Sequence, residues 1–411
     1  TAVALVYTFL RSIYPNIDFY IPDRYAEGYG ISYKGIDFAI ENKFSLIIVL
    51  DCGIKAVEKI AYAKENGVEF IICDHHRPSE NIPEACAVLD PKRHDCNYPF
   101  KELSGCGVGF KLIQAYSSKY GISTEKLNSY LDLVVVSIAA DIVPITGENR
   151  VLAYYGLKLI NKKPRPGFEA IFQYSGIKRV VDAKGPFQFN REISISDLVF
   201  LVGPRINAAG RIENAKNSVE LLITTEFSKA LKLADQINDL NIERKSLDLT
   251  ATQAALEFIQ SEPSLKDSKS TVVFNKNWHK GVIGIVASRL TDYYYRPTIV
   301  LTQSNGLVTG SARSIKDFDV YDAIDSCSDL LEHFGGHKYA AGLSLKPENL
   351  QNFKERFEEY VKENTTDSMF VPEIEIDANI ILKEINNKFF RVLKQLAPFG
   401  PGNMPPVFQT D

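Results

Sequence analysis

The chain has 411 residues, of which 45% are hydrophobic and 24% charged, with a formal net charge of −4. This composition indicates a globular protein of two or three domains and argues against a surface that is basic throughout, although it leaves room for a local basic groove. Six cysteines without CxxC spacing indicate a reduced, cytoplasmic protein, and no apolar run reaches the ~18 residues of a membrane span.

The N-terminal part alternates short apolar strands with amphipathic helices. We expect strands at 46–50, 68–73 and 87–89 and helices at 35–42 and 54–65. Continuous apolar strands joined by helices predict a parallel sheet with helices on both faces. Ligands of such sheets bind at the carboxyl ends of the strands, so the residues that follow these strands are candidates for a site.

Carboxylates and imidazoles occupy those positions. Asp51 follows the first strand, and Asp74, His75 and His76 follow the second, in a chain with only six histidines. Carboxylates beside neutral imidazoles suit a divalent cation such as Mn²⁺. A cation there would activate water and offset the charge of a phosphate. The alternative is structural, because Asp51 and Asp74 could cap the helices that follow.

The middle of the chain is expected to be mostly helical. Ser123 can cap a buried helix that ends at Asp141, although the valines at 134–136 also favour a strand. Asp141 follows an apolar element and is either a further metal ligand or a polar helix end. Residues 165–190 are expected to be irregular. The helical pattern at 228–259 indicates one long helix or two, of the kind that connects domains.

The segment from Gly203 to Arg211 combines cations with small residues. Arg205, Asn207 and Arg211 lie among glycines and alanines, which let a ligand approach the backbone. Guanidinium groups suit anions such as phosphate. The alternative is a turn between domains with arginines at its surface.

A second α/β unit is expected next in the chain. Its strands are expected at 271–274, 298–301, 307–312 and 340–345, and its helices at 282–290, 320–334 and 350–363. An alternating stretch at 374–381 predicts an exposed strand of a third module.

Three glycine-rich turns in this second unit have an arginine or a histidine within or beside them. They lie at 281–284, at 310–314 with Ser311 and Arg313, and at 335–337 with His337. Backbone N–H groups at such turns bind phosphates when a helix follows. Glycines that only end helices are the alternative.

These motifs, in their order along the chain, resemble the DHH phosphoesterase superfamily, and within it the RecJ family of single-strand-specific 5′→3′ exonucleases. The Asp-His-His signature alone is weak, but the ordered set covers essentially the whole chain and is specific. The similar stretches are 24–30, 51–53, 74–76, 140–141, 203–211, 278–290, 310–314, 335–337 and 396–403. The last of them resembles the start of the family's oligonucleotide-binding (OB) fold.

The resemblance implies the fold class. It is an α/β protein with a parallel-sheet DHH domain, joined by a long helix to a smaller mixed α/β DHH-associated domain and followed by the start of an OB-like module. The implied bounds are 1–225 for the DHH domain, 226–262 for the connecting helix, 263–366 for the DHH-associated domain and 367–411 for the start of the OB module.

The resemblance also implies roles for single residues. Asp51, His75 and Asp141 would bind metal, with Asp51 bridging two ions. His76 and Asp74 would be catalytic, His76 at the scissile phosphate or the attacking water and Asp74 orienting its neighbours. Substrate would be bound by Arg24, Ser311 and Arg313 at the 5′-phosphate and by Arg205, Asn207, Arg211 and His337 along the DNA backbone.

The implied cofactors are two Mn²⁺ or Mg²⁺ ions in the full-length protein, and the implied substrate is single-stranded DNA with a 5′-phosphate. A single-strand-binding protein or a helicase would be a further partner of this monomer in recombination and repair. The family's Asp-x-Asp-Gly motif would lie just before Thr1, and a helix already under way opens the chain. We therefore expect a fragment that lacks this motif and most of the OB domain, with low or absent nuclease activity.

Two other functions are open at this point. A DHH enzyme for short oligonucleotides or cyclic dinucleotides would need no OB module, so the stretch at 396–403 favours the RecJ branch. A non-catalytic nucleic-acid-binding protein would not need Asp51, His75 and Asp141, whose presence favours catalysis.

Overall fold

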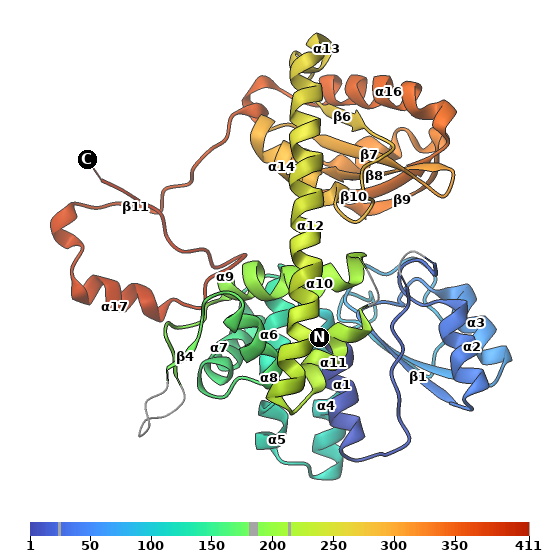
Figure 1. Ribbon diagram of the computed structural model, residues 1–411, viewed down its shortest axis with the longest axis vertical. Coiled ribbons are helices and arrows are strands. Elements are labelled where there is room, and N and C mark those ends of the chain that lie inside the picture. The colour runs from blue at the N-terminus through green and yellow to red at the C-terminus, as the bar shows by residue number, and fades with distance from the viewer. Residues whose placement is uncertain (24–25, 181–187, 213–214, 411) are drawn as a thin grey trace. The chain divides into compact units, whose positions relative to one another are not determined.

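The computed structural model describes residues 1–23, 26–180, 188–212 and 215–410. Their contacts define unit 1 (Thr1–Asn241 and Ile376–Asp411) and unit 2 (Ile242–Glu375). The boundary falls inside α12 (Phe227–Ser261), which is one helix of 35 residues (Figure 1). Of the two possibilities for this segment, the single helix is therefore correct, and its polar residues at 241–245 do not interrupt it.

The sheet of unit 1 is parallel, as predicted, and has the order β1-β2-β3. Its strands are β1 (Leu46–Leu50), β2 (Glu69–Cys73) and β3 (Ala87–Leu89). One face packs on α2 (Tyr33–Glu41) and α3 (Val57–Glu65), and the other on α1 (Ala2–Arg11) and α4 (Gly105–Tyr120). Because side chains alternate along a strand, Val49 faces the first pair of helices and Leu50 the second.

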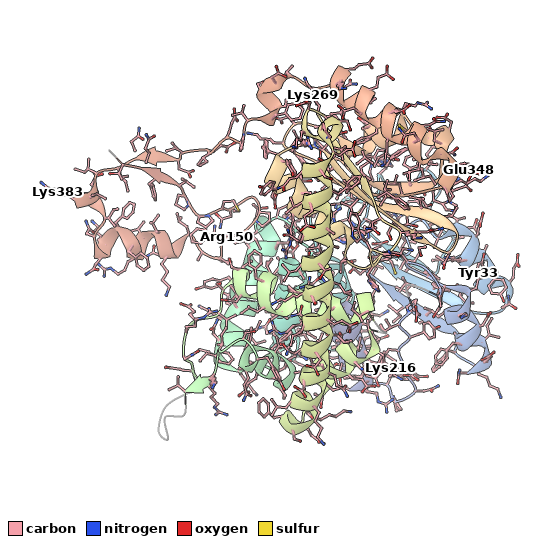
Figure 2. All side chains as sticks on the ribbon, turned by 45° about the horizontal axis from the view of Figure 1, so that its top comes forward. Tyr33, Arg150, Lys216, Lys269, Glu348 and Lys383 are labelled. Carbon is pink, nitrogen blue, oxygen red and sulfur yellow. The ribbon has the colours of Figure 1, made fainter. Side chains whose placement is uncertain are left out.

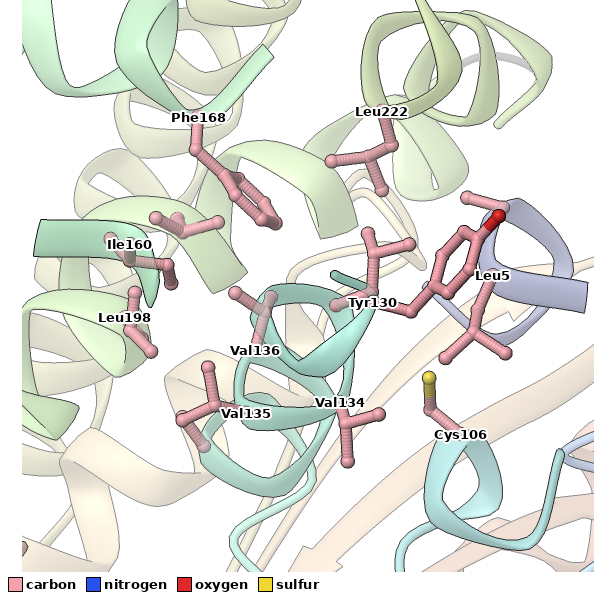
Figure 3. Packing of buried hydrophobic residues seen from close by; sticks show 14 of the residues in the cluster. Leu5, Cys106, Tyr130, Val134, Val135, Val136, Ile160, Phe168, Leu198 and Leu222 are labelled. Atoms are coloured by element: carbon pink, nitrogen blue, oxygen red, sulfur yellow. The ribbon is translucent and has the colours of Figure 1, made fainter. Parts of the chain in front are cut away.

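The helical core of unit 1 surrounds α6 (Leu131–Ala140). Val134, Val135 and Val136 have no exposed surface and lie among side chains from several helices (Figure 3). Each such burial contributes about 1.5–3 kcal/mol, and no strand partner is available here, so packing overrides the strand preference of the valines. The segment expected as one helix is two, because α5 (Thr124–Asn128), capped by Ser123 as predicted, ends before α6 begins.

The segment expected to be irregular contains regular structure, so that prediction is wrong. Pro166 opens α8 (Pro166–Gln173), whose apolar face is fully buried at Phe168, Ile171 and Phe172. The other elements of this part of unit 1 are α7 (Gly147–Lys162), β4 (Arg179–Val180), β5 (Gln188–Phe189), α9 (Ile195–Asp197), the π-helix η1 (Leu198–Val202), α10 (Gly203–Ile212) and α11 (Lys216–Ile223).

Unit 2 is built on a five-stranded mixed sheet with the order β6-β7-β8-β10-β9. The strands are β6 (Thr271–Phe274), β7 (Thr298–Ser304), β8 (Leu307–Arg313), β9 (Leu331–His337) and β10 (Ala340–Leu345). The helices are α13 (Pro263–Lys266), α14 (Ile283–Tyr294), α15 (Val320–Asp325), α16 (Leu350–Glu363) and the 3₁₀ turns η2 (Ser328–Leu330), η3 (Pro347–Asn349) and η4 (Asp367–Phe370).

The helix expected at 320–334 is wrong in its second half. The α-helix is limited to α15, and after the 3₁₀ turn η2 the chain forms β9, which pairs antiparallel with β10 and brings His337 opposite Ala340. Gly336 has φ of 155°, and a Cβ there would meet the Ala340 carbonyl oxygen at 2.4 Å. The Gly-Gly-His turn therefore ends a strand of a hairpin and does not follow a helix.

The C-terminal segment belongs to unit 1. Its elements are β11 (Ala378–Asn379), the 3₁₀ turn η5 (Leu382–Glu384), α17 (Asn387–Gln395) and β12 (Phe408–Gln409), with β11 parallel to β12. The Ile145 N–H donates to the Pro401 carbonyl at 2.6 Å. Arg150, labelled in Figure 2, donates to the Leu396 carbonyl at 2.9 Å. The strand expected at 374–381 is limited to β11. No helix among the described residues is long and apolar enough to cross a membrane.

Candidate active site

The carboxyl edge of the parallel sheet carries the predicted cluster. Asp51 directly follows β1 and adopts φ of 66°, a left-handed conformation that turns the chain sharply at the strand end. Its N–H still donates to the Cys73 carbonyl at 2.8 Å, so the strand pairing holds the turn in place. Asp74, His75 and His76 follow β2 at the same edge.

His75 brings the acidic groups together. Its Nε2 lies 3.2 Å from Asp51 Oδ1 and 3.2 Å from Asp141 Oδ2, so the structure places Asp141, the C-cap residue directly after α6, at this edge. His75 Nδ1 lies 3.0 Å from the Leu103 carbonyl oxygen, which can only accept a hydrogen bond. That contact places the proton of the neutral ring on Nδ1 and leaves the Nε2 lone pair facing the carboxylates.

This arrangement fits a divalent cation. Among the described residues, neither His75 Nε2 nor the buried Asp51 Oδ1 has a hydrogen-bond partner, although the two atoms are close. Electron-rich atoms that converge without a hydrogen between them are typical of a metal site. Donor atoms of Asp51, His75 and His76 also lie within 4.8 Å of one another. Asp141 Oδ2 lies 3.2 Å from His75 Nε2, so we take Asp141, as predicted, for the third ligand.

The pKa values of these groups show that the cluster is crowded with negative charge. Burial raises the pKa of Asp141, and the charge of Asp51 raises it further. Burial lowers the pKa of His75, but the nearby carboxylates of Asp51 and Asp141 outweigh it, so that the pKa is raised. A bound cation would relieve the repulsion between the two carboxylates.

Asp74 has no oxygen to spare for a metal. Only 1% of its surface is exposed, its Oδ2 accepts from the Ile54 N–H at 3.0 Å, and its Oδ1 accepts from the His75 N–H at 2.8 Å. The same Oδ1 lies 2.7 Å from His76 Nδ1. Burial acts to raise the pKa of Asp74, but the bond from His76 and the backbone donors keep it lowered. Asp74 therefore fixes the orientation of the half-exposed His76 ring.

Gly105, at the start of α4, is a site residue that the sequence reasoning missed. A Cβ at this position would lie 1.9 Å from Asp51 Oδ1, so only glycine leaves room for the Asp51 carboxylate. The available signal was the spacing of glycines at 105, 107 and 109 after the cap residue Ser104. The adjacent Leu103 carbonyl holds His75, so one segment supports both ligands.

Asp90 is a second carboxylate that the sequence reasoning missed. It follows β3 directly, the same strand-then-aspartate pattern that identified Asp51 and Asp74. It is 3% exposed, its Oδ1 accepts from the Lys92 N–H at 2.8 Å, and its Oδ2 has no partner among the described residues. Burial and the charge of Asp74 raise the pKa of Asp90 to about 6.

The predicted anion-binding segment forms α10 and is not a turn. Arg205 is 8% exposed, and its guanidinium donates to the Leu201 carbonyl at 2.9 Å and to Asn238 Oδ1 at 3.2 Å. Asn207 is exposed. Gly210 lines a pocket of about 190 Å³ that also includes Asp51. The predicted residue Arg24 and the side chain of Arg211 lie outside the described part of the chain.

Unit 2 contains a separate niche suited to an anion. Arg313 Nε donates to Ser288 Oγ at 3.2 Å and its Nη1 to Ser311 Oγ at 3.1 Å, while burial lowers the pKa of Arg313. A Cβ on Gly284 would lie 3.0 Å from Ser311 Oγ, so this glycine keeps the niche open. Arg313 and His337 both pair in register with Ala340, which places them in one row across the sheet. Ser288 was not predicted.

Comparison with known proteins identifies the family. Protein-family models match the DHH family N-terminal domain at residues 1–138, the DHHA1 domain at 267–363 and the RecJ OB domain at 376–411. The single-stranded-DNA-specific exonuclease RecJ of Haemophilus influenzae is 34% identical over 424 residues, covering 99% of this chain and 72% of the relative. The chain belongs to the RecJ family.

Other RecJ proteins agree with this assignment. The single-stranded-DNA-specific exonuclease RecJ of Bacillus subtilis is 37% identical over 99% of this chain, which spans 50% of that relative's length. The crystal structure of RecJ from Thermus thermophilus in complex with Mn²⁺ matches with a TM-score of 0.84 and 28% identity, covering 100% of this chain and 57% of that one. A Mg²⁺ complex of the same protein matches with a TM-score of 0.71. The predicted fold class is confirmed by these matches.

Proposed function

We propose that the chain carries the catalytic part of a nuclease that hydrolyses single-stranded DNA from its 5′ end with a divalent cation. The observation that carries this proposal is the convergence of Asp51 Oδ1 and Asp141 Oδ2 on the unprotonated Nε2 of His75, each at 3.2 Å. RecJ relatives named as single-stranded-DNA-specific exonucleases, and the RecJ structures with Mn²⁺ or Mg²⁺, support it. The match to the RecJ OB domain favours long strands over dinucleotides as substrates.

The side chains of this chain divide the work of such a reaction. Asp51, His75 and Asp141 would hold the cation, which lowers the pKa of a coordinated water and offsets phosphate charge. His76, oriented by Asp74 at 2.7 Å, presents its Nε2 to the scissile phosphate or to the attacking water. The predicted substrate contacts in both units, including the niche of Arg313, would hold the DNA backbone and its 5′-phosphate.

The described ligand set suffices for one cation. Two ions, the number that the resemblance implies, would share Asp51 and need carboxylates beyond these three ligands. We therefore propose weak hydrolysis by any form of the protein that offers only this set. A monomeric state, a cytoplasmic location, a role in recombination and repair, and partnership with a single-strand-binding protein or a helicase are further proposals, of which the first is tested by gel filtration.

The test is a pair of histidine variants. His75→Ala removes the central ligand and is expected to weaken Mn²⁺ binding, measured by calorimetry, at least about 100-fold. Hydrolysis of a 3′-labelled, 5′-phosphorylated single strand should fall by a similar factor. His94→Ala removes an exposed histidine and is the matched control. Equal Mn²⁺ uptake by the two variants would refute the metal site, and faster cleavage of a dinucleotide than of a long strand would refute the substrate.

A further inference from the structure

A polar cluster in unit 2 lies between α12 and α14, outside the niche described above. Arg289, on α14, donates from Nη2 to Asp248 Oδ2 at 2.7 Å, and Thr252 Oγ1 lies 3.4 Å from Asp248 Oδ1. Asp248 is 1% exposed, and these two contacts engage both of its oxygens. Arg244 lies one helical turn before Asp248 on α12.

Arg244 has a buried donor atom that lacks an acceptor in the described part of the chain. Its Nε is buried and has no hydrogen-bond partner among the described residues. Burial lowers the pKa of Arg244, the charge of Asp248 acts to raise it, and the nearby charge of Arg289 lowers it further. Two guanidinium groups thus lie near one carboxylate, which is bonded to Arg289, and among the described residues Arg244 has a donor that lacks the acceptor such buried groups normally have.

The cluster is held by rigid packing. Ala251 and Ala255 of α12 share one core cluster with Val286 and Leu290 of α14, all with at most 4% of their surface exposed. The backbones that carry Arg244 and Arg289 are therefore fixed. The Arg289 side chain, with 43% of its surface exposed, is held on this backbone by its bond to Asp248.

The same helix links this cluster to the anion niche. Ser288 of α14 accepts from Arg313 at 3.2 Å, and the next residue, Arg289, about 100° further round the helix, pairs with Asp248 of α12. The guanidinium groups of Arg313 and Arg289 are therefore both held at successive positions of α14. A strand held in the niche by one phosphate would find a further cation at this helix.

We propose that Arg244 and Arg289 bind a backbone phosphate of the single strand, as a second anion site of unit 2. Two guanidinium groups offer fork-shaped donors that match the oxygens of a phosphate, and an anion there would offset the charge of the pair. Phosphate contacts of this kind position a strand without reading its sequence. This inference rests on the proposed function, because it takes the ligand to be the same strand of DNA.

The experiment measures binding without cleavage. Anisotropy of a fluorescent 5′-phosphorylated oligothymidylate is titrated with the EDTA-treated chain at several salt concentrations. Arg244→Gln is expected to bind about tenfold more weakly, and the slope of log affinity against log salt should shrink by about 0.7, the value for one phosphate contact on a single strand. Lys245→Gln removes an exposed charge from the next position of α12 and should change neither quantity.

Stability separates a binding role from a structural one. Arg244 Nε has no hydrogen-bond partner among the described residues, so Arg244→Gln should keep or raise the melting temperature while affinity falls. Arg244→Lys should restore the salt slope but only part of the affinity, because it keeps the charge and loses the fork. A lower melting temperature in Arg244→Gln, with affinity restored fully by lysine, would show a structural role and overturn the proposal.

Two further outcomes separate this inference from the proposed function. Unchanged affinity and salt slope in Arg244→Gln overturn the phosphate site alone, provided that His75→Ala still abolishes Mn²⁺ binding and hydrolysis. Failure of the unmodified chain to bind single strands overturns both. Equal binding of an acidic peptide, with the same loss in Arg244→Gln, overturns the assignment of phosphate as the ligand.

Discussion

The sheet edge of unit 1 and the α12–α14 face of unit 2 are opposite in chemistry. In the described part of the chain, acceptor atoms of Asp51 and His75 converge at the edge without donors, whereas at the face Arg244 has a buried donor without an acceptor. The first arrangement suits a cation and the second an anion. In the parallel sheet of unit 1 the carboxyl ends of the strands meet at one edge, which brings their carboxylates together. In the mixed sheet of unit 2 most neighbouring strands are antiparallel, so its cationic groups come from strand ends and from the helices around the sheet.

The largest expected effect comes from a substitution that disturbs only the sheet edge of unit 1. Gly105→Ala would place a Cβ 1.9 Å from Asp51 Oδ1, so the carboxylate must move and Mn²⁺ affinity should fall about 100-fold. Gly107→Ala is the control on the same helix, since its Cβ would meet no atom closer than 3.4 Å. Calorimetry measures the metal, and anisotropy should show that both variants still bind DNA. Normal Mn²⁺ affinity in Gly105→Ala would mean that Asp51 is not a ligand.

The next effect concerns stability at the acidic edge in the metal-free chain. The folded pKa of Asp90, about 6, lies above its ordinary value of 3.8, so the ionised form destabilises the fold. Asp90→Asn should raise the free energy of unfolding by roughly 2 kcal/mol at pH 7.5. The gain should shrink as pH falls from about 6 to 4 and vanish below, where Asp90 is protonated in both states.

The control for this prediction has the opposite sign. Arg93 lowers the pKa of Asp95, so Asp95→Asn should destabilise the chain slightly at neutral pH. Urea unfolding at several pH values measures both variants. A gain for Asp90→Asn that does not depend on pH would show that side-chain volume, and not charge, is responsible.

The smallest expected effect tests whether Asp74 orients the His76 ring at the sheet edge of unit 1. The bond with Asp74 raises the pKa of His76, so Asp74→Asn should move the midpoint of the pH–rate profile assigned to His76 to lower pH and reduce the rate about tenfold. Affinity for DNA in EDTA should stay unchanged, because the cationic face of unit 2 is not involved. A reduced rate with an unmoved midpoint would contradict the role of Asp74 in orienting His76.

Sequence reasoning succeeded where the position of a polar residue depends on the strand directly before it. A strand followed by a polar residue predicted Asp51, Asp74 and His75 at one edge because parallel strands end together. The same rule would have found Asp90, which was overlooked. It failed at 320–334, where the helix ends early and the remaining residues pair with β10, because the energy of cross-strand pairing is invisible in a local window.

By itself the sequence determined the α/β class, the parallel sheet and the ligand types, since these depend on periodicity and on residues adjacent to strands. Only the tertiary structure decided that Asp141 lies 3.2 Å from His75, that Gly105 leaves room for Asp51, and that a buried donor of Arg244 lacks an acceptor among the residues described. Each of these facts concerns a distance, or a missing hydrogen-bond partner, between segments that are far apart in the chain. Such relations arise from packing, which no local pattern encodes.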